Sequence, residues 1–222
     1  RSRAFFSLCQ GQAPGIDDRI PLLVYNPHPF PVTRDISCEF IMPDQNWAGT
    51  FMNFTAYHQD KPLPTQIERE ASNVPVDWRK NAVFHATLAP MSMNRFDLKP
   101  SVLPKKPAPT LKASNGLLCF DNGLYQVDIS TRTGLIERYS VNGVRILDKN
   151  SCRPVVLNDS EDPWGSPVQA FREKAGQFTR LSAARAAEIS GLKKLVPVRV
   201  IEDGPARSVI ESLLSWHDST VI

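Results

Sequence analysis

The sequence lacks any apolar run that approaches the roughly 20 residues of a membrane-spanning helix. It also lacks the Gly-x-Gly-x-x-Gly and P-loop motifs of nucleotide-binding proteins and the Gly-x-Ser-x-Gly elbow of serine hydrolases. The net charge is only +3, and Lys and Arg are scattered rather than gathered in a stripe. We therefore expect no membrane span and no nucleic-acid partner, because the basic footprint of a nucleic-acid-binding protein is missing.

Cysteine and histidine are sparse and never clustered. The cysteines form no Cys-x-x-Cys pair and stand far apart, at Cys9, Cys38, Cys119 and Cys152. This spacing argues against a disulfide scaffold and slightly favours a reducing compartment such as the cytoplasm. The histidines show no metal-ligand spacing and are expected to be structural or surface residues: His28, His58, His85 and His217.

Proline, by contrast, is abundant. The chain has 19 prolines in 222 residues, well above the average usage of about 5%. Proline is tolerated at strand ends, sheet edges and turns but disrupts helix interiors, so this composition favours an all-β protein with many loops. Pro27, Pro29 and Pro31 impose an extended lead-in without backbone donors, so a strand at 22–26 must end before the next strand begins.

Two segments of the first hundred residues alternate between apolar and polar side chains. In residues 32–42 the apolar parity holds Val32, Ile36, Cys38, Phe40 and Met42, with Arg34 as its one polar member. In residues 82–88 it holds Ala82, Phe84, Ala86 and Leu88. A period of two predicts half-buried strands, and we interpret residues 16–100 as a small antiparallel β-sandwich.

Residues 99–112, KPSVLPKKPAPTLK, contain four prolines and four lysines and mark a domain boundary. We place a linker at 101–113 and a second β-domain at 114–222, while residues 1–15 are expected to be the end of a preceding helical segment. In the second domain, a Thr-Arg-Thr-Gly turn at 131–134 and Asn142-Gly143 predict a three-stranded meander. Residues 182–189 predict a helix, and one strand is expected on each side of Asp203-Gly204.

Acidic residues are adjacent at 17–18, 161–162 and 202–203, and solvated loops are expected at all three places because neighbours on one strand face opposite ways. The loop NDSEDPWG at 158–165 puts three acidic groups beside Trp164, an arrangement by which proteins hold sugars. Asp162 and Trp164 are therefore our candidate substrate-facing residues. The alternative, which the residues alone favour, is that Trp164 only fills the end of a sandwich.

Several segments, taken in order, resemble the β-rich C-terminal region of glycoside hydrolase family 38 α-mannosidases. They are IPLLVYNPHPFP, LAPMSMNRFDL, NGLYQVDISTRTGLIERYSVNG, EDPWG and VIEDGPARSVIE, and they cover about residues 16–222. The second segment lacks the glycine that the family has there, and Asp121 stands where the family often has Glu. The resemblance implies a small β-sandwich followed by a galactose-mutarotase-like supersandwich, which we expect to be truncated in this chain.

The resemblance also implies what the chain does not contain. The family's aspartate nucleophile, acid/base carboxylate and divalent metal, usually zinc, lie in an N-terminal α/β-barrel that a helical bundle follows. No segment here matches those motifs, so no catalytic or metal-ligating residue is assigned. The expected partners are the barrel and bundle of the parent enzyme, together with mannosides or oligosaccharides.

Our leading hypothesis is a non-catalytic β-domain fragment of an α-mannosidase that hydrolyses terminal α-linked mannose. It would support the catalytic domain and help to shape the sugar site, and the chain alone is expected to be inactive. The first alternative is a free-standing carbohydrate-binding or surface β-module without enzymatic activity. A mutarotase-like epimerase ranks last, because residues 114–216 contain no histidine for its acid/base chemistry.

Overall fold

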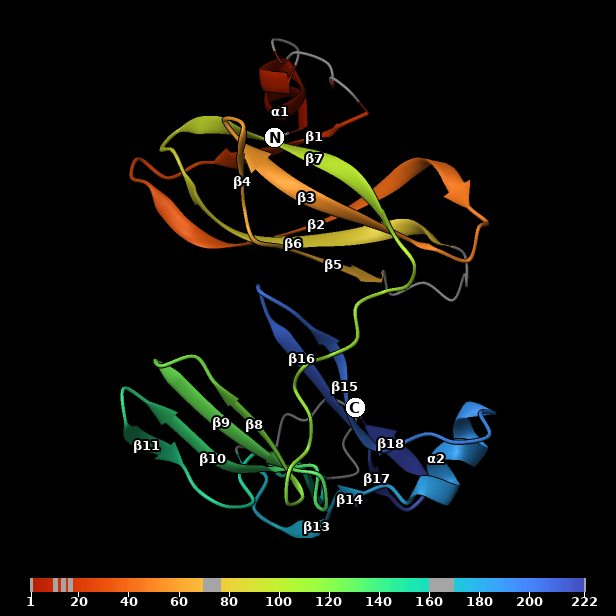
Figure 1. Ribbon diagram of the computed structural model, residues 1–222. Coiled ribbons are helices and arrows are strands. Elements are labelled where there is room, and N and C mark those ends of the chain that lie inside the picture. Colours follow the sequence, from red (N-terminus) through yellow and green to blue (C-terminus); the bar gives the residue numbers. More distant parts are fainter. Residues whose placement is uncertain are drawn as a thin grey trace. The chain divides into compact units, whose positions relative to one another are not determined.

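The computed structural model describes residues 2–9, 12, 15, 18–69, 77–159 and 170–221. In these residues the chain forms antiparallel β-structure with two short helices, which confirms the expected all-β class (Figure 1). The chain divides into two compact units. Unit 1 comprises Arg1–Ala108 and Glu202–Arg207, and unit 2 comprises Pro109–Ile201 and Ser208–Ile222.

Unit 1 opens with the predicted N-terminal helix and continues as two antiparallel sheets. Its elements are α1 (Ser2–Cys9), β1 (Ile20–Asn26), β2 (Val32–Asn46), β3 (Phe51–His58), β4 (Lys61–Pro62), β5 (Thr65–Arg69), β6 (Asp77–Leu88) and β7 (Ser92–Leu103). One sheet has the strand order β1-β7-β3-β4, and the other has the order β2-β6-β5. The segment predicted as a linker therefore begins as strand, because β7 continues to Leu103.

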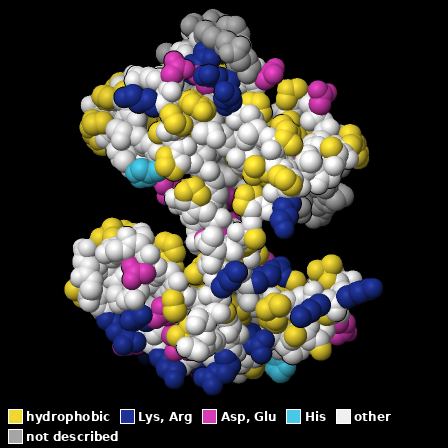
Figure 2. All heavy atoms as spheres, in the orientation of Figure 1, with side chains coloured by type: hydrophobic (Ala, Val, Ile, Leu, Met, Phe, Trp, Pro, Cys, Tyr) yellow, Lys and Arg dark blue, Asp and Glu magenta, His cyan; other side chains and the backbone are white. Residues whose placement is uncertain are grey.

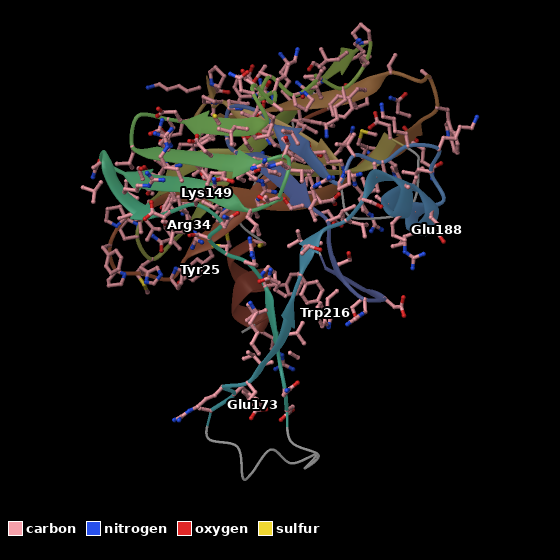
Figure 3. The ribbon with its side chains drawn as sticks, turned by 90° about the horizontal axis from the view of Figure 1, so that it is seen from below. Tyr25, Arg34, Lys149, Glu173, Glu188 and Trp216 are labelled. Atoms are coloured by element: carbon pink, nitrogen blue, oxygen red, sulfur yellow. The ribbon has the colours of Figure 1, made fainter. Side chains whose placement is uncertain are left out.

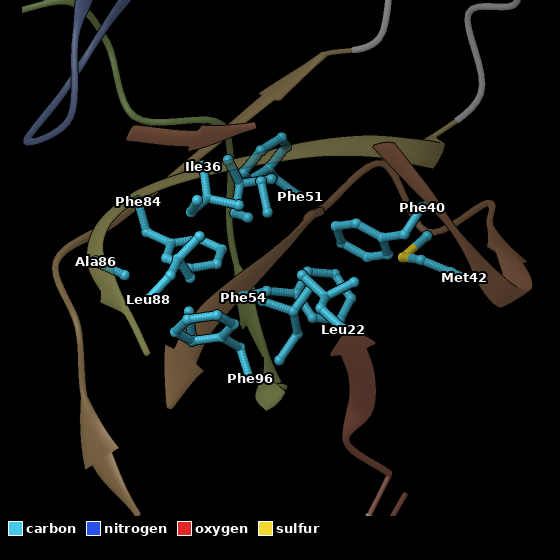
Figure 4. Close-up of a cluster of buried hydrophobic side chains, with 14 residues drawn as sticks. Leu22, Ile36, Phe40, Met42, Phe51, Phe54, Phe84, Ala86, Leu88 and Phe96 are labelled. Atoms are coloured by element: carbon cyan, nitrogen blue, oxygen red, sulfur yellow. The ribbon is translucent and has the colours of Figure 1, made fainter. Parts of the chain in front are cut away.

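The two sheets of unit 1 enclose one hydrophobic core, drawn in Figure 4. Phe54, Phe96 and Leu98 come from the first sheet, and Phe40 and Phe84 come from the second. The ring centroids of Phe40 and Phe54 lie 4.8 Å apart in an edge-to-face arrangement, and those of Phe84 and Phe96 lie 4.9 Å apart. Rings from opposite sheets thus interlock, which stabilises the packing of the two layers.

The alternation predicted for residues 32–42 and 82–88 is confirmed. Ile36, Phe40 and Met42 are buried, whereas Arg34, the polar exception on that parity, is exposed. Strands β2 and β6 pair from Val32↔Leu88 to Ile41↔Arg79, so their apolar faces point to the core together. The proline-rich lead-in lies outside any strand, between Asn26 and Val32, as its fixed backbone requires.

Unit 2 contains shorter strands in smaller sheets. Its elements are β8 (Leu117–Asp121), β9 (Tyr125–Ser130), β10 (Ile136–Val141), β11 (Val144–Leu147), β12 (Val155–Leu157), β13 (Lys174–Gln177), β14 (Thr179–Arg180), α2 (Ala183–Ser190), β15 (Val198–Asp203), β16 (Ser208–Ser212), β17 (Leu214–Trp216) and β18 (Ser219–Val221). The sheets have the orders β11-β10-β9-β8, β12-β13, β14-β17-β18 and β15-β16. The tip of the β15–β16 hairpin, Glu202–Arg207, belongs to unit 1.

The turns and the cap of unit 2 follow from local sequence. Asn142 and Gly143 join β10 to β11 with φ values of 49° and 77°, the positive values that a tight two-residue hairpin turn needs. The predicted meander is present, and β8 extends it to four strands. Helix α2 begins after Ser182, whose hydroxyl accepts a hydrogen bond from Arg185 N at 3.1 Å, and it ends at Gly191 in the left-handed conformation.

Trp216 packs against the backbone of β13 at Gly176 (Figure 3). A Cβ atom at position 176 would lie 2.0 Å from the Trp216 ring, so only glycine fits there.

All four cysteines are free. Within the described part of the chain, every helix is too short or too polar to cross a membrane. Apolar side chains are visible on the surface of both units in Figure 2.

We predict that Phe96→Ala lowers the free energy of unfolding by about 3–5 kcal/mol, because it removes a fully buried ring from the contact between the two sheets. Urea denaturation measures this loss. The matched control is Phe30→Ala, since Phe30 is 55% exposed and its loss is expected to cost less than about 1 kcal/mol. Equal losses in the two variants would contradict a single core between the sheets.

Candidate functional site

The candidates Asp162 and Trp164 lie in residues 160–169, outside the described residues. The same holds for Asp17 and Glu161 of the adjacent acidic pairs. The third pair corrects an expectation. Glu202 does not lie in a solvated loop, because it belongs to β15 and its carboxylate accepts a 2.5 Å hydrogen bond from Lys106 Nζ.

Each of the four histidines has a structural neighbour. His58 Nδ1 lies 3.0 Å from Arg95 O, and the exposed His85 Nδ1 lies 2.9 Å from Asp35. The rings of His28 and His217 contact the adjacent aromatic side chains of Phe30 and Trp216. Across the described ranges, no three His, Cys, Asp or Glu side chains meet in a metal-binding group.

A buried polar cluster surrounds Glu68 on β5. Ile67 points into the core, so Gln66 and Glu68 face the other side of the sheet, yet both are buried. Glu68 accepts hydrogen bonds from the Gln66 amide at 2.9 Å and from Asn81 Nδ2 at 3.1 Å. Arg207 donates two further hydrogen bonds to the Glu68 carboxylate, from Nε to Oε1 at 2.8 Å and from Nη2 to Oε2 at 2.5 Å.

The Glu68–Arg207 ion pair joins a buried carboxylate to a solvent-exposed guanidinium group. The Glu68 side chain is only 4% exposed, whereas that of Arg207 is 43% exposed. The hydrogen bond to Glu68 raises the pKa of Arg207 above its ordinary value. Four donors therefore satisfy the buried carboxylate, which is the condition under which burial of a charge is tolerated.

The hairpin tip, Glu202–Arg207, covers Gln66 as well. Gln66 Oε1 accepts hydrogen bonds from Ala206 N at 3.3 Å and from Arg207 N at 3.1 Å. Gly204 lies so close that a Cβ atom there would be 2.6 Å from Gln66 Oε1. Three residues of the tip thus have defined partners in unit 1: Glu202 contacts Lys106, Gly204 packs on Gln66 and Arg207 pairs with Glu68.

A second polar clamp joins the end of β1 to the turn between β6 and β7. Asn26 is 1% exposed, and its Nδ2 donates to Phe30 O, Leu88 O and Ala89 O. Asn94 holds the same turn from the other side, since its Oδ1 accepts from Ala89 N at 2.7 Å. The Asn-Pro segment and the Pro-x-x-x-x-Arg-Phe segment therefore meet around Ala89.

A third feature is the turn between β2 and β3, residues 46–50. Asn46 Nδ2 donates to Thr50 O at 2.9 Å and to Asp77 Oδ2 at 2.9 Å, and Asn46 Oδ1 accepts from Ala48 N at 3.1 Å. Asp77 also accepts from Met52 N at 2.8 Å and pairs with the buried ammonium of Lys80. The Lys80 Nζ lies 3.7 Å from the centroid of the Phe51 ring, which adds a cation–π contact.

Burial alone would raise the pKa of Asp77, but the hydrogen bonds from Lys80, Met52 N and Asn46 outweigh it, so the pKa is lowered. The ionised carboxylate of Asp77 is therefore the form that holds the turn between β2 and β3.

A pocket of about 470 Å³ opens beside this turn in unit 1. Its polar lining comes from Asp18, Asp44, Gln45 and Asn46, and its apolar lining from Ile20, Met42, Pro43, Met52, Phe54 and Pro100. Its volume lies within the range of small-molecule sites. Trp47 follows Asn46 directly and is 76% exposed. Trp47 borders the lining residue Asn46 in sequence but is not itself among the lining residues. Sequence reasoning missed this pocket, because its lining comes from distant segments of the chain.

No protein-family model, curated protein or solved structure matches the chain. Within the described residues, the arrangement can stabilise a fold, bury carboxylates and hold a small polar ligand.

We predict that acid destabilises unit 1 through Asp77. A carboxyl group with a lowered folded-state pKa contributes stability that is complete above its unfolded value, about 3.9, and is lost as the pH falls through the folded value. Urea denaturation between pH 2 and 6 measures the effect. In Asp77→Asn the stability at pH 6 is expected to be lower and its decline on acidification smaller. An unchanged slope in that variant would contradict the role of Asp77.

We also predict that Gly204→Ala destabilises the chain by about 1–3 kcal/mol, because the added methyl group overlaps the buried Gln66 amide. A double-mutant cycle with Gln66→Ala separates this overlap from other causes. The alanine at position 204 is expected to cost little once the Gln66 side chain is gone, so the two losses are not additive. Additive losses would contradict direct packing of the tip on Gln66.

Proposed function

We propose that the chain is a non-catalytic β-region of a glycoside hydrolase family 38 α-mannosidase, with a small β-sandwich followed by part of a galactose-mutarotase-like supersandwich. In the parent enzyme it holds the catalytic domain in place and helps to shape the sugar site. Asp162 and Trp164 are the proposed substrate-facing residues, and the parent's reaction is hydrolysis of terminal α-linked mannose. Scaffolding of this kind matters because reacting groups must be held in fixed positions.

The observation that carries the proposal is that residues of two segments of the resemblance meet at one turn. Asn26 and Asn94 belong to different motifs and bind the same turn at Ala89. Residues of a third motif, Gly204 and Arg207, fit the outer face of β5 at Gln66 and Glu68. Two of the ordered motifs thus share a contact, whereas Gln66 and Glu68 lie outside every quoted segment, and it is the shared contact at Ala89 that supports the family assignment.

The sheet β11-β10-β9-β8 of unit 2 adds support. Tyr125 pairs with Val141, and Val141 pairs with Val144, so the three side chains share one face. Tyr125 is 41% exposed and Val144 is 62% exposed. An apolar sheet face that stays open to solvent is unfavourable for an isolated domain, and it favours a sandwich whose remaining strands belong to the parent enzyme.

We predict that this chain alone does not hydrolyse an aryl α-mannoside, with or without added zinc, whereas the intact parent does. The comparison requires the upstream reading frame, in which we expect a barrel with His and Asp metal ligands. Release of the aryl group, measured for both proteins at equal concentration, is the readout. Metal-dependent turnover by residues 1–222 would overturn the non-catalytic assignment. A parent that contains no barrel, or that leaves α-mannosides intact, would overturn the family assignment.

A further inference from the structure

Trp47 is exposed in a way that the other described tryptophans are not. It is 76% exposed, whereas Trp78 is half-buried with its Nε1 donating to Met42 O at 3.0 Å, and Trp216 is half-buried against Gly176. An exposed indole loses the apolar burial that usually stabilises tryptophan. A rigid, exposed aromatic ring is common at binding surfaces, because it offers a large contact area at little entropic cost.

The turn that carries Trp47 is held from both sides. Asn46 bridges Thr50, Ala48 and Asp77, and Gly49 supplies the positive φ of 70° that the turn requires. Asp77 is in turn anchored by the buried Lys80 and by Met52 N. The backbone of residue 47 is therefore fixed before any ligand arrives, which lowers the cost of binding.

The adjacent pocket offers hydrogen-bonding groups that the fold does not consume. Asp44 and Asp18 are exposed and Gln45 is half-buried, and all three line the pocket. Within the described residues their side chains make no hydrogen bond or ion pair, in contrast to the fully engaged Asn46. The rest of the lining is apolar: Ile20, Met52 and Pro100 are half-buried, whereas Met42 and Phe54 are buried beneath them.

We propose that this pocket and Trp47 form a carbohydrate-binding site for a neutral oligosaccharide. One sugar ring stacks its C–H face on the Trp47 indole, and the next enters the pocket against Ile20 and Met52. Its hydroxyl groups donate to the carboxylates of Asp44 and Asp18 and exchange hydrogen bonds with the Gln45 amide, which both donates and accepts. A sugar fits this mixture because its rings alternate apolar faces with hydroxyl edges.

This inference is independent of the mannosidase proposal. It depends only on residues of unit 1, and it gives that unit a binding activity of its own. Failure of the parent enzyme assay leaves it untouched, and failure of sugar binding at Trp47 leaves the family assignment untouched.

The test is an NMR titration of the ¹⁵N-labelled 222-residue chain with three neutral probes: α-mannotriose, maltotriose and cellotriose. We expect at least one trisaccharide to shift the Trp47 indole N–H and the backbone amides of residues 44–50.

Trp47→Ala is expected to raise the Kd about tenfold, the size of one lost aromatic contact. Asp44→Asn is expected to weaken binding less, because an amide oxygen still accepts a hydroxyl proton. Phe30→Ala, which removes another exposed ring of unit 1, is the matched control and should leave the Kd unchanged.

Circular dichroism of each variant establishes that the fold is intact, which the exposure of Trp47 leads us to expect. The proposal is wrong if none of the three sugars shifts residues 44–50. It is equally wrong if Trp47→Ala binds as tightly as the original chain. Shifts caused by spermidine but by no sugar would assign the pocket to a cationic ligand through its two carboxylates and would also overturn the proposal.

Discussion

The structure of unit 1 depends on the satisfaction of one buried carboxylate. Glu68 lies on the outer face of β5, where a solvent-exposed position would be ordinary, yet it is only 3% exposed. Such a charge is tolerated only when donors surround it, and Gln66, Asn81 and Arg207 supply them. Removal of Arg207 would leave the buried charge with only two amide donors, so the stabilities of β5, β6 and the hairpin tip are coupled.

The pair formed by Asp77 and Lys80 applies the same constraint elsewhere in unit 1. The Lys80 side chain is 1% exposed, and its ammonium contacts both the Asp77 carboxylate and the Phe51 ring. Asp77 then directs its other oxygen to Met52 N and to the Asn46 amide. A buried ion pair of this kind adds little net stability, but it permits a single geometry for the turn between β2 and β3. That turn positions Trp47 and borders the pocket.

These clusters give unit 1 the rigidity that both proposed roles require. The proposed role in an α-mannosidase needs rigidity, and the clamps at Ala89 and Glu68 provide it. The proposed sugar site at Trp47 needs the same rigidity for a different reason, since a fixed backbone at Trp47 lowers the ordering cost of binding. The clamps and the turn at Trp47 both depend on buried polar side chains whose hydrogen bonds are made within unit 1.

The sequence alone determined the local backbone states of this protein. The alternation of residues 32–42 specified β2 with its buried face, Asn142-Gly143 specified a tight turn, and Ser182 and Gly191 bounded the only later helix among the described residues. Such patterns are readable because side-chain parity and φ preferences act within a few residues. Tertiary structure decided the rest. Arg207 meets Glu68 across 139 positions, Glu202 lies on Lys106 instead of in a solvated loop, and the pocket beside Trp47 assembles residues from four strands and Asp18. Local preferences contain no information on which distant donor reaches which buried acceptor, because that choice depends on strand pairing and on the packing of the two sheets.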